Sequence, residues 1–250
     1  MHRLLVDTET LACASVELAQ AAARHLKVLR PKDGERIELF DGKGRSRTYS
    51  CPRQANMPLT AVSEVRIAAA PHRGITLFAC VTKGSRWDWT IEKAVELGVT
   101  CIVPVISARC IVRLDAKERA AKRERWMRVA EDAARQSDAH WLPDILAAVD
   151  FDEALRLVKD CVCFAGALMD PPPDPLLKAV QSALQDDSER TLAIFVGPEG
   201  DFTPQELAAL QEIAVPTSFG SSVLRAETAA IYGVSVLAAA IASSQYGVNT

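Results

Sequence analysis

Two glycine-containing segments hold the residue types with the clearest chemical potential, and the first is VGPEGDFTP at positions 196–204. Gly197 and Gly200 are three residues apart, a spacing that lets the main chain turn tightly and approach a ligand without obstruction by side chains. Thr203 is expected to be the N-cap of a helix, with a proline after it and Glu206 completing a capping box. The segment therefore predicts a binding loop between a buried strand and a helix. A tight structural turn without a ligand is the alternative.

The second segment, FGSSVLRAETA at positions 219–229, again passes from a strand through a short loop into a helix. Arg225 ends the loop beside the positive pole of that helix, and Glu227 follows in its first turn. A cation at this place suits an electron-rich group, such as a nucleobase that must lose a proton before it attacks carbon. Glu227 is the nearest carboxylate, and we expect it to receive the proton or to orient Arg225. The alternative is a surface arginine that simply pairs with Glu227.

The elements that must position these segments are strands and helices in alternation from residue 75 onward, which is typical of a mostly parallel sheet covered on both faces. We expect the two loops to leave adjacent strands and to line one crevice at the carboxyl edge of the sheet. The expected strands are Ile75–Val81, Cys101–Ile106, Cys161–Gly166, Leu192–Val196 and Val215–Phe219. The expected helices are Trp87–Leu97, Ala116–Asp138, Phe151–Val158, Pro175–Leu184, Pro204–Ile213 and Glu227–Ser243. The last helix is nearly uncharged, so either its own subunit or a second subunit must cover it.

Residues 1 to about 70 have a different pattern, which predicts a small β-rich module. A helix is expected over Val16–Leu29, with Ser15 as N-cap and Pro31 after its end. The expected strands are Glu35–Phe40, Arg45–Cys51 and Thr60–Ala68, with turn residues at 41–44 between the first two. The boundary with the following region is expected at positions 71–74, PHRG.

Charge and composition narrow the class of protein. The net charge is −3, yet residues 1–72 hold 11 basic against 8 acidic side chains, so this part is the more suited to phosphates. No apolar run is expected to approach the roughly 18 residues of a membrane span, and Met1–Leu11 carries Asp7 and Glu9 where a signal peptide is apolar. We therefore expect a cytoplasmic protein without a membrane partner.

Several common sites are not indicated by the sequence. The seven cysteines and four histidines form no C-x-x-C pair and no cluster, so no metal is expected and the cysteines are interpreted as core residues. Neither G-x-G-x-x-G nor a P-loop nor G-x-S-x-G occurs, which argues against an oxidoreductase or an α/β hydrolase.

Together with the run KGSRWDWTIEKAVELGVTCIVPVISARC (83–110), the segments GPEGDFT and GSSVLRAETA resemble the RsmE family of 16S ribosomal RNA uracil-N3 methyltransferases, within the SPOUT superfamily. The resemblance covers nearly the whole chain. It implies an α/β fold: a PUA-like RNA-binding β-barrel in residues 1–72 and, in residues 73–250, a SPOUT methyltransferase domain with a trefoil knot. General topology rules would argue against a knot. The resemblance also implies a homodimer.

The activity that the resemblance implies is transfer of a methyl group from S-adenosylmethionine to N3 of a specific uridine in 16S ribosomal RNA or the small ribosomal subunit. Arg225 and Glu227 match the catalytic segment. The implied cofactor-binding residues are Leu168, Gly197, Pro198, Glu199, Gly200, Phe219, Gly220, Ser222, Val223 and Leu224. The expected RNA-binding residues are Arg24, Arg30, Lys83, Arg86, Lys93 and Arg109, although a solvated or helix-stabilising role is the alternative for these charges.

One stretch departs from the family pattern. Relatives usually end the long middle helix with Glu-Gln-Ser and then an arginine three residues after the glutamine, whereas this chain reads RQSDAH at 135–140. Arg135 thus replaces an acid and Ala139 a base, and His140 is a candidate substitute. A non-catalytic RNA-binding or ribosome-assembly protein that retains the fold stays an alternative to the enzyme.

Overall fold

The computed structural model of the chain describes residues 1–250 except 53–56, 159, 170, 186–188 and 247–250. The chain divides into two units. Unit 1 consists of Met1–Pro71 and Glu131–Leu142, and unit 2 consists of His72–Ala130 and Pro143–Thr250.

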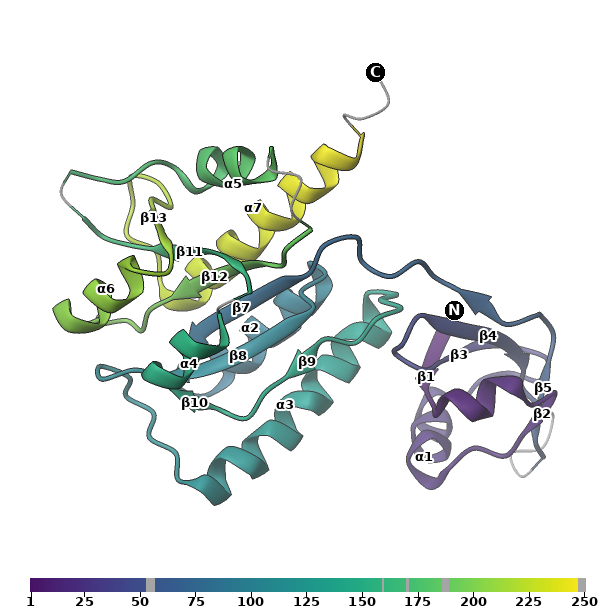
Figure 1. The fold of residues 1–250 in the computed structure, drawn as a ribbon. Coiled ribbons are helices and arrows are strands. Elements are labelled where there is room, and N and C mark those ends of the chain that lie inside the picture. The colour runs from purple at the N-terminus through teal and green to yellow at the C-terminus, as the bar shows by residue number, and fades with distance from the viewer. Residues whose placement is uncertain (53–56, 159, 170, 186–188, 247–250) are drawn as a thin grey trace. The chain divides into compact units, whose positions relative to one another are not determined.

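Unit 2 is built on a parallel sheet in the order β10-β8-β7-β12-β11-β13, with β9 beside β8 (Figure 1). Its central strands are nearly continuous apolar runs, as expected for parallel strands buried on both faces. The strands are β7 (Ile75–Cys80), β8 (Cys101–Ile106), β9 (Asp144–Ile145), β10 (Val149–Asp150), β11 (Val162–Gly166), β12 (Leu192–Val196) and β13 (Val215–Thr217). The α/β class expected from the sequence is therefore confirmed.

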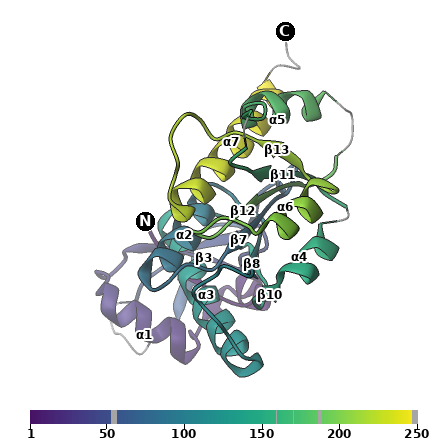
Figure 2. The ribbon, with the colours of Figure 1, turned by 90° about the vertical axis from the view of Figure 1, so that its left-hand side faces the viewer.

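Helices cover both faces of this sheet, as the turned view in Figure 2 shows. They are α2 (Ser85–Glu96), α3 (Ala116–Gln136, which continues into unit 1), α4 (Phe151–Leu157), α5 (Leu176–Leu184), α6 (Pro204–Gln211) and α7 (Ala226–Tyr246). On one face, α7 packs on β7 and β12 between α2 and α5. On the other face, the Phe151 ring of α4 lies 6.5 Å from that of Phe195, which stacks on Phe78 at 4.5 Å.

The helix α7 has the length and apolar composition of a membrane span over Ala226–Ser244. The expectation that no apolar run approaches that length is therefore wrong for this helix. It is nevertheless a core helix in part, because 39% of that window is buried and Val234 and Leu237 are fully enclosed.

Unit 1 contains a mixed sheet in the order β1-β3-β4-β5-β2, with β6 paired to β4. Only β1 and β3 pair in parallel; the other described pairs are antiparallel. The strands are β1 (His2–Leu5), β2 (Ser15–Val16), β3 (Arg36–Phe40), β4 (Arg45–Ser50), β5 (Leu59–Ala61) and β6 (Arg66–Ile67). A 3₁₀ helix, η1 (Thr8–Ala12), and one α-helix, α1 (Gln20–Leu29), accompany them.

In unit 1, β1 and η1 were not expected from the sequence, and two of the expected elements differ in the structure. The helix expected over Val16–Leu29 begins only at Gln20, because Ser15 and Val16 pair with β5 across a separation of more than 40 residues. The strand expected over Thr60–Ala68 is broken into β5 and β6. At the break, the Ser63 hydroxyl accepts a hydrogen bond from the Thr48 N–H, and its carbonyl accepts one from Arg47.

The last turn of α3 and the residues after it belong to unit 1 because a buried arginine binds them. Arg3 donates hydrogen bonds of 3.0 Å to the carbonyls of Ala134 and Ala139, pairs with Glu38 at 2.6 Å and lies over the Phe40 ring. The atypical stretch 135–140 is thus part of this packing, and Arg135 pairs with Asp132 in its own helix.

Candidate active site

Three strand ends of unit 2 converge at the candidate active site. The GPEG loop (197–203) follows β12, and the second loop (218–224) follows β13. The expectation that these two strands are neighbours is wrong, because β11 lies between them and pairs with both. The residues after β11, beginning at Ala167, therefore form the floor between the two loops.

The GPEG loop has the helix start that its sequence predicts. The Thr203 hydroxyl accepts a hydrogen bond of 3.2 Å from the Glu206 N–H, and the Glu206 carboxylate accepts one of 2.9 Å from the Thr203 N–H. Phe202 is buried against Phe151, with ring centroids 5.4 Å apart. A Cβ on Gly197 would lie 3.3 Å from the Phe202 ring, so glycine permits the close approach at the start of this loop.

A cavity of about 110 Å³ lies between the two loops and the end of β11. Of the ten residues expected to bind the cofactor, the structure places all but Gly200 in its lining: Leu168, Gly197, Pro198, Glu199, Phe219, Gly220, Ser222, Val223 and Leu224. Sequence reasoning missed further lining residues, among them Gly166, Asp201, Ser218, Ala226 and Ala229. Asp201, Ala226 and Ala229 lie within the two segments, and Ser218 adjoins the second. Only Gly166 is distant in sequence, and the order of the strands brings it to the loops.

The second loop contributes main chain and apolar side chains to the cavity. Gly220 has a φ of 118°, a conformation that side chains disfavour, and its N–H donates to the Ser218 hydroxyl at 3.2 Å. The Phe219 ring lies directly on Gly166, where a Cβ would approach it to 2.8 Å. Exposed main chain at glycine turns beside apolar walls suits a flat nucleoside, so the lining fits S-adenosylmethionine.

The two expected catalytic residues are not in the lining of the cavity, although both are next in sequence to residues that line it, and in the described structure they do not form an ion pair. Arg225 stands between Leu224 and Ala226, which both line the cavity, and its side chain is exposed. In the described part of the chain no hydrogen bond or ion pair holds its guanidinium. Glu227 is 9% exposed, and its Oε2 is buried without a hydrogen-bond partner there. The alternative of a surface Arg225–Glu227 pair is therefore not what the structure shows.

The expected RNA-binding residues of unit 2 differ in their surroundings. Arg86 pairs with Glu199 at 3.1 Å, while Lys93 pairs with Glu92 and Glu96, whose hydrogen bonds raise the pKa of its amine. Arg109 binds main-chain carbonyls of the GPEG loop. Lys83 is exposed and, within the described residues, has no ionic partner. In unit 1, Arg24 and Arg30 are exposed on and just after α1.

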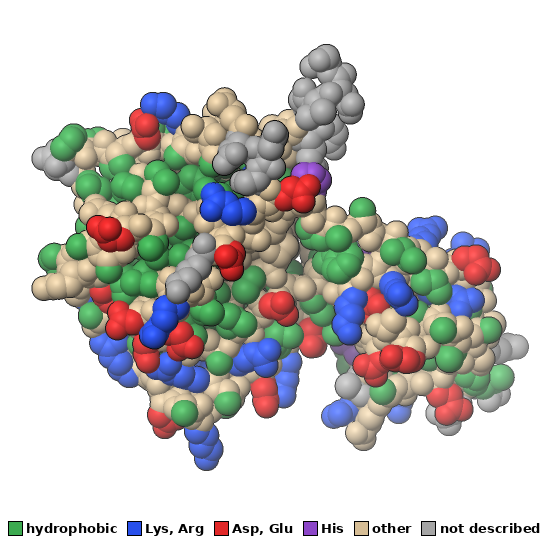
Figure 3. Space-filling view, viewed as in Figure 1, with side chains coloured by type: hydrophobic (Ala, Val, Ile, Leu, Met, Phe, Trp, Pro, Cys, Tyr) green, Lys and Arg blue, Asp and Glu red, His purple; other side chains and the backbone are tan. Residues whose placement is uncertain are grey.

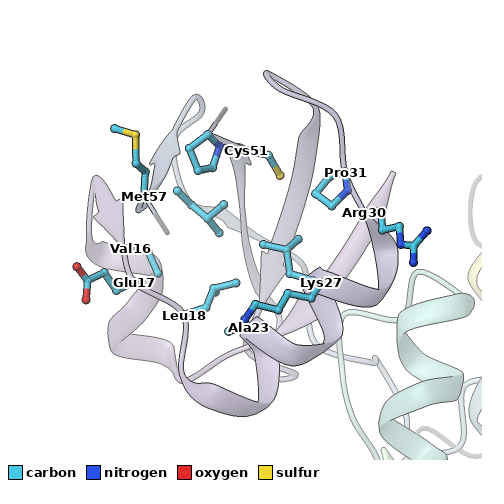
Figure 4. A pocket seen from close by; sticks show the side chains of 12 residues that line it. Val16, Glu17, Leu18, Ala23, Lys27, Arg30, Pro31, Cys51 and Met57 are labelled. Atoms are coloured by element: carbon cyan, nitrogen blue, oxygen red, sulfur yellow. The ribbon is translucent and has the colours of Figure 1, made fainter. Parts of the chain in front are cut away.

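A larger cavity of about 490 Å³ lies in unit 1, beside α1 and the short strands β2 and β5 (Figure 4). Its lining is mainly apolar, with Lys27 and Arg30 as its cations, and Figure 4 shows the Arg30 side chain directed away from Val16 and Leu18. None of the expected catalytic or cofactor-binding residues lies there. The smaller cavity of unit 2 is therefore the candidate active site. No group of three metal-ligating side chains is found among the residues that the structure describes.

Comparison with known proteins gives the class and then the family. A family model described as an RNA methyltransferase domain matches residues 70–238, which include the whole candidate site. The ribosomal RNA small subunit methyltransferase E of Synechocystis is 30% identical over 91% of this chain and 74% of its own length. The fold and site are thus those of the RNA methyltransferase class. The chain belongs to the ribosomal RNA small subunit methyltransferase E family.

Solved structures agree with this assignment. The ribosomal RNA small subunit methyltransferase E from Neisseria gonorrhoeae, bound to S-adenosylmethionine, is 30% identical with a TM-score of 0.77, covering 95% of this chain and 96% of its own. A methyltransferase from Legionella pneumophila, also in complex with S-adenosylmethionine, is 29% identical with a TM-score of 0.79, covering 95% of this chain and 97% of its own. The family resemblance drawn from the two glycine segments is confirmed.

Proposed function

We propose that this chain is an S-adenosylmethionine-dependent methyltransferase that methylates N3 of a specific uridine in 16S ribosomal RNA, as RNA or within the small ribosomal subunit. Membership of the family and the two cofactor-bound relatives support the reaction class. The observation that carries the chemical step is the exposed Arg225 guanidinium, which follows the cavity residue Leu224 and has no ionic partner among the described residues.

The cofactor is held by the two loops and the end of β11. Main-chain groups at Gly197, Gly220 and their neighbours face the cavity without a side chain in the way, and Leu168, Val223 and Leu224 supply apolar walls. When bound, S-adenosylmethionine supplies a methyl group on a positively charged sulfur. Two loops that hold the donor in a fixed orientation supply a large part of the rate, because in-line attack requires precise placement.

Arg225 stabilises the uracil in the form that reacts. Uracil N3 carries a proton at neutral pH, and its loss leaves negative charge that is shared with the carbonyl oxygens of the base. A guanidinium at the N-terminus of α7 stabilises that charge, more strongly in a site from which the substrate excludes water. Glu227 follows two residues later, and one of its buried carboxylate oxygens has no hydrogen-bond partner among the described residues. This suits a group that receives the N3 proton.

RNA binding is assigned to both units. Residues 1–72, with their basic excess and the exposed Arg24 and Arg30, are the proposed RNA-binding domain. In unit 2, Lys83 is exposed just before α2. Chemistry on N3 requires a base outside a stacked duplex, so these cations hold the phosphates around an unstacked uridine.

The enzyme acts as a cytoplasmic homodimer. Large apolar side chains are exposed around the cavity and on the neighbouring elements of unit 2: Leu168, Met169, Leu177, Ile213, Val215 and Val223. Figure 3 shows hydrophobic side chains gathered over the part of unit 2 that holds α5, β13 and α6. An apolar patch of this kind typically marks a protein interface, and a second copy of this unit is the occupant that family membership favours.

The test combines calorimetry with a methyl-transfer assay on small subunits that lack the modification. We expect Arg225→Ala to keep S-adenosylmethionine binding but to lower kcat by on the order of 10²- to 10³-fold, as for loss of a group that stabilises transition-state charge. Arg225→Lys, which keeps the positive charge, should retain more of the kcat than Arg225→Ala does. Glu227→Gln keeps the size and shape of the side chain but removes its negative charge, so it tests whether the carboxylate is needed. An unchanged kcat in Arg225→Ala would remove Arg225 from the mechanism.

The substrate is tested separately by mass spectrometry of 16S RNA from a strain that lacks this gene. The expected result is loss of N3-methyluridine, restored by the wild-type gene and not by the Arg225→Ala gene. If the modified base persists, the proposed substrate is wrong. Wild-type protein that binds RNA but neither binds the cofactor nor transfers methyl groups would support the assembly-factor alternative instead.

A further inference from the structure

The GPEG loop is held by a side chain that lies outside it, on the turn after β8. Arg109 Nη1 donates a hydrogen bond of 2.8 Å to the Gly200 carbonyl and one of 3.2 Å to the Phe202 carbonyl. The methylenes of Arg109 lie where a Cβ on Gly200 would make ordinary contact, at 3.6 and 3.7 Å. One guanidinium therefore fixes two carbonyls on either side of Asp201, whose positive φ of 59° marks the sharpest bend of the loop.

A second contact joins the same two turns. The Ala108 N–H donates to Glu206 Oε1 at 2.8 Å, while the other oxygen of Glu206 closes the capping box with the Thr203 N–H. Glu206 thus bridges the turn after β8 and the end of the GPEG loop. The two turns are tied by a cation and by a carboxylate, each using charge-assisted hydrogen bonds to main chain.

The turn that carries Arg109 is itself held rigidly. Arg113 donates to the carbonyls of Ser107 and Ala108 at 2.9 and 2.6 Å. The Cys110 sulfur accepts a hydrogen bond from the Ser107 N–H at 3.3 Å and lies 3.4 Å from the Ser107 hydroxyl oxygen. Arg109 therefore extends from a fixed base toward the GPEG loop.

From these contacts we infer that Arg109 is a positioning residue for cofactor binding, which acts through the GPEG loop and not by gripping RNA. The inference rests on the proposed function of that loop as the cofactor cradle. A loop with glycines at both ends of its turn loses much conformational freedom when a ligand orders it. A loop that is already held in the binding shape avoids this cost, so the contacts of Arg109 raise affinity for the cofactor without touching it.

The two possible roles of Arg109, positioning the GPEG loop and contacting RNA, predict opposite effects of its substitution on cofactor binding and on RNA binding. If Arg109 positions the loop, Arg109→Ala raises the Kd for S-adenosylmethionine, measured by calorimetry, by on the order of tenfold, the effect of losing a hydrogen bond to a charged group. The Kd for RNA and the salt dependence of RNA binding stay unchanged. In turnover, KM for the cofactor rises more than kcat falls.

Matched variants make the result decisive. Arg109→Lys keeps the charge but not the two-carbonyl geometry, so it should lie between wild type and Arg109→Ala. Lys83→Ala, which removes an exposed cation, should weaken RNA binding and leave cofactor binding intact. Arg156→Ala serves as the control, because this exposed arginine contacts only its own helix in the described structure. Near-equal melting temperatures identify the effect as local.

Specific outcomes overturn the inference. If Arg109→Ala binds S-adenosylmethionine as tightly as the wild type does, the GPEG loop does not need the hydrogen bonds of Arg109 to bind the cofactor. If Arg109→Ala or Arg109→Lys binds RNA more weakly while its affinity for the cofactor is unchanged, Arg109 is an RNA contact. Failure of the proposed function gives a different result, because the wild-type protein itself would then bind no cofactor.

Discussion

The two loops that frame the candidate active site differ in how they are held. The GPEG loop is hydrogen-bonded from outside by Arg109 and through Glu206, and its Phe202 is anchored in the core. The second loop has its own Ser218–Gly220 hydrogen bond, and in the described structure another segment hydrogen-bonds to it only at its first residue, where Ser218 pairs through the main chain with Asp174 and Leu176. In the described part of the structure, no side chain from another element hydrogen-bonds to residues 219–224. At its tip, Val223 is 77% exposed.

This difference suggests a division of labour between the loops. A loop whose shape is set by the fold contributes geometry before any ligand arrives, whereas a loop with few external contacts takes its final shape from what binds to it. We therefore propose that the GPEG loop is the half of the cofactor-binding site that already has its binding shape before the cofactor arrives. We propose that the second loop, with its glycine conformation and exposed apolar tip, is the half that the cofactor and a partner subunit complete.

The largest expected effect on stability comes from the anchor of the GPEG loop. Phe202→Ala removes a buried ring that packs on Phe151, so we expect the free energy of unfolding to fall by about 3–5 kcal/mol. Val223→Ala, at the tip of the second loop, should change it by less than about 0.5 kcal/mol. Urea denaturation of both variants measures the contrast. Equal losses at the two positions would contradict the distinction between the loops.

A smaller effect is expected from glycines that differ in backbone conformation. Gly220→Ala places a side chain at a φ of 118°, and this strain should lower the free energy of unfolding by about 1–3 kcal/mol. Gly200→Ala is the matched control in the GPEG loop, because its added Cβ would meet only ordinary contacts with Arg109. Chemical denaturation compares them. A larger loss of stability at Gly200 than at Gly220 would mean that the GPEG loop, and not the second loop, is the strained one.

Much of the framework of unit 2 could be predicted from the sequence because its signals are local. Buried parallel strands are long apolar runs, so Cys101–Ile106 and Leu192–Val196 were predicted with the bounds that the structure shows. The capping box of Thr203 and Glu206 is likewise local, since both partners lie within one turn. Each signal needs only a few neighbouring residues to be recognised.

The elements that were missed depend on distant partners. Ser15 and Val16 became a strand because β5 offers hydrogen bonds to them, not because of their own pattern. Arg109 has the same charge in the sequence whether it meets a phosphate or a carbonyl, and only the fold brings Gly200 within 2.8 Å of it. The burial of Arg3 against the end of α3 joins residues more than 130 positions apart. No periodicity reveals such contacts.

The smallest expected effect on the single chain is at the tip of the second loop, where the partner subunit is proposed to pack. Val223→Ser should leave the stability of the monomer unchanged within about 0.5 kcal/mol, since the side chain is exposed there. In a symmetric dimer the same side chain is buried twice, so its loss should raise the dimer dissociation constant at least about tenfold. Sedimentation equilibrium measures this constant, and Val28→Ser, at a valine that is 78% exposed on α1, is the control. Two results would contradict this prediction: a wild-type protein that stays monomeric, or a dimer that both variants weaken equally. In either case the exposed apolar surface of unit 2 is not the dimer interface. The second loop would then be completed by the cofactor alone.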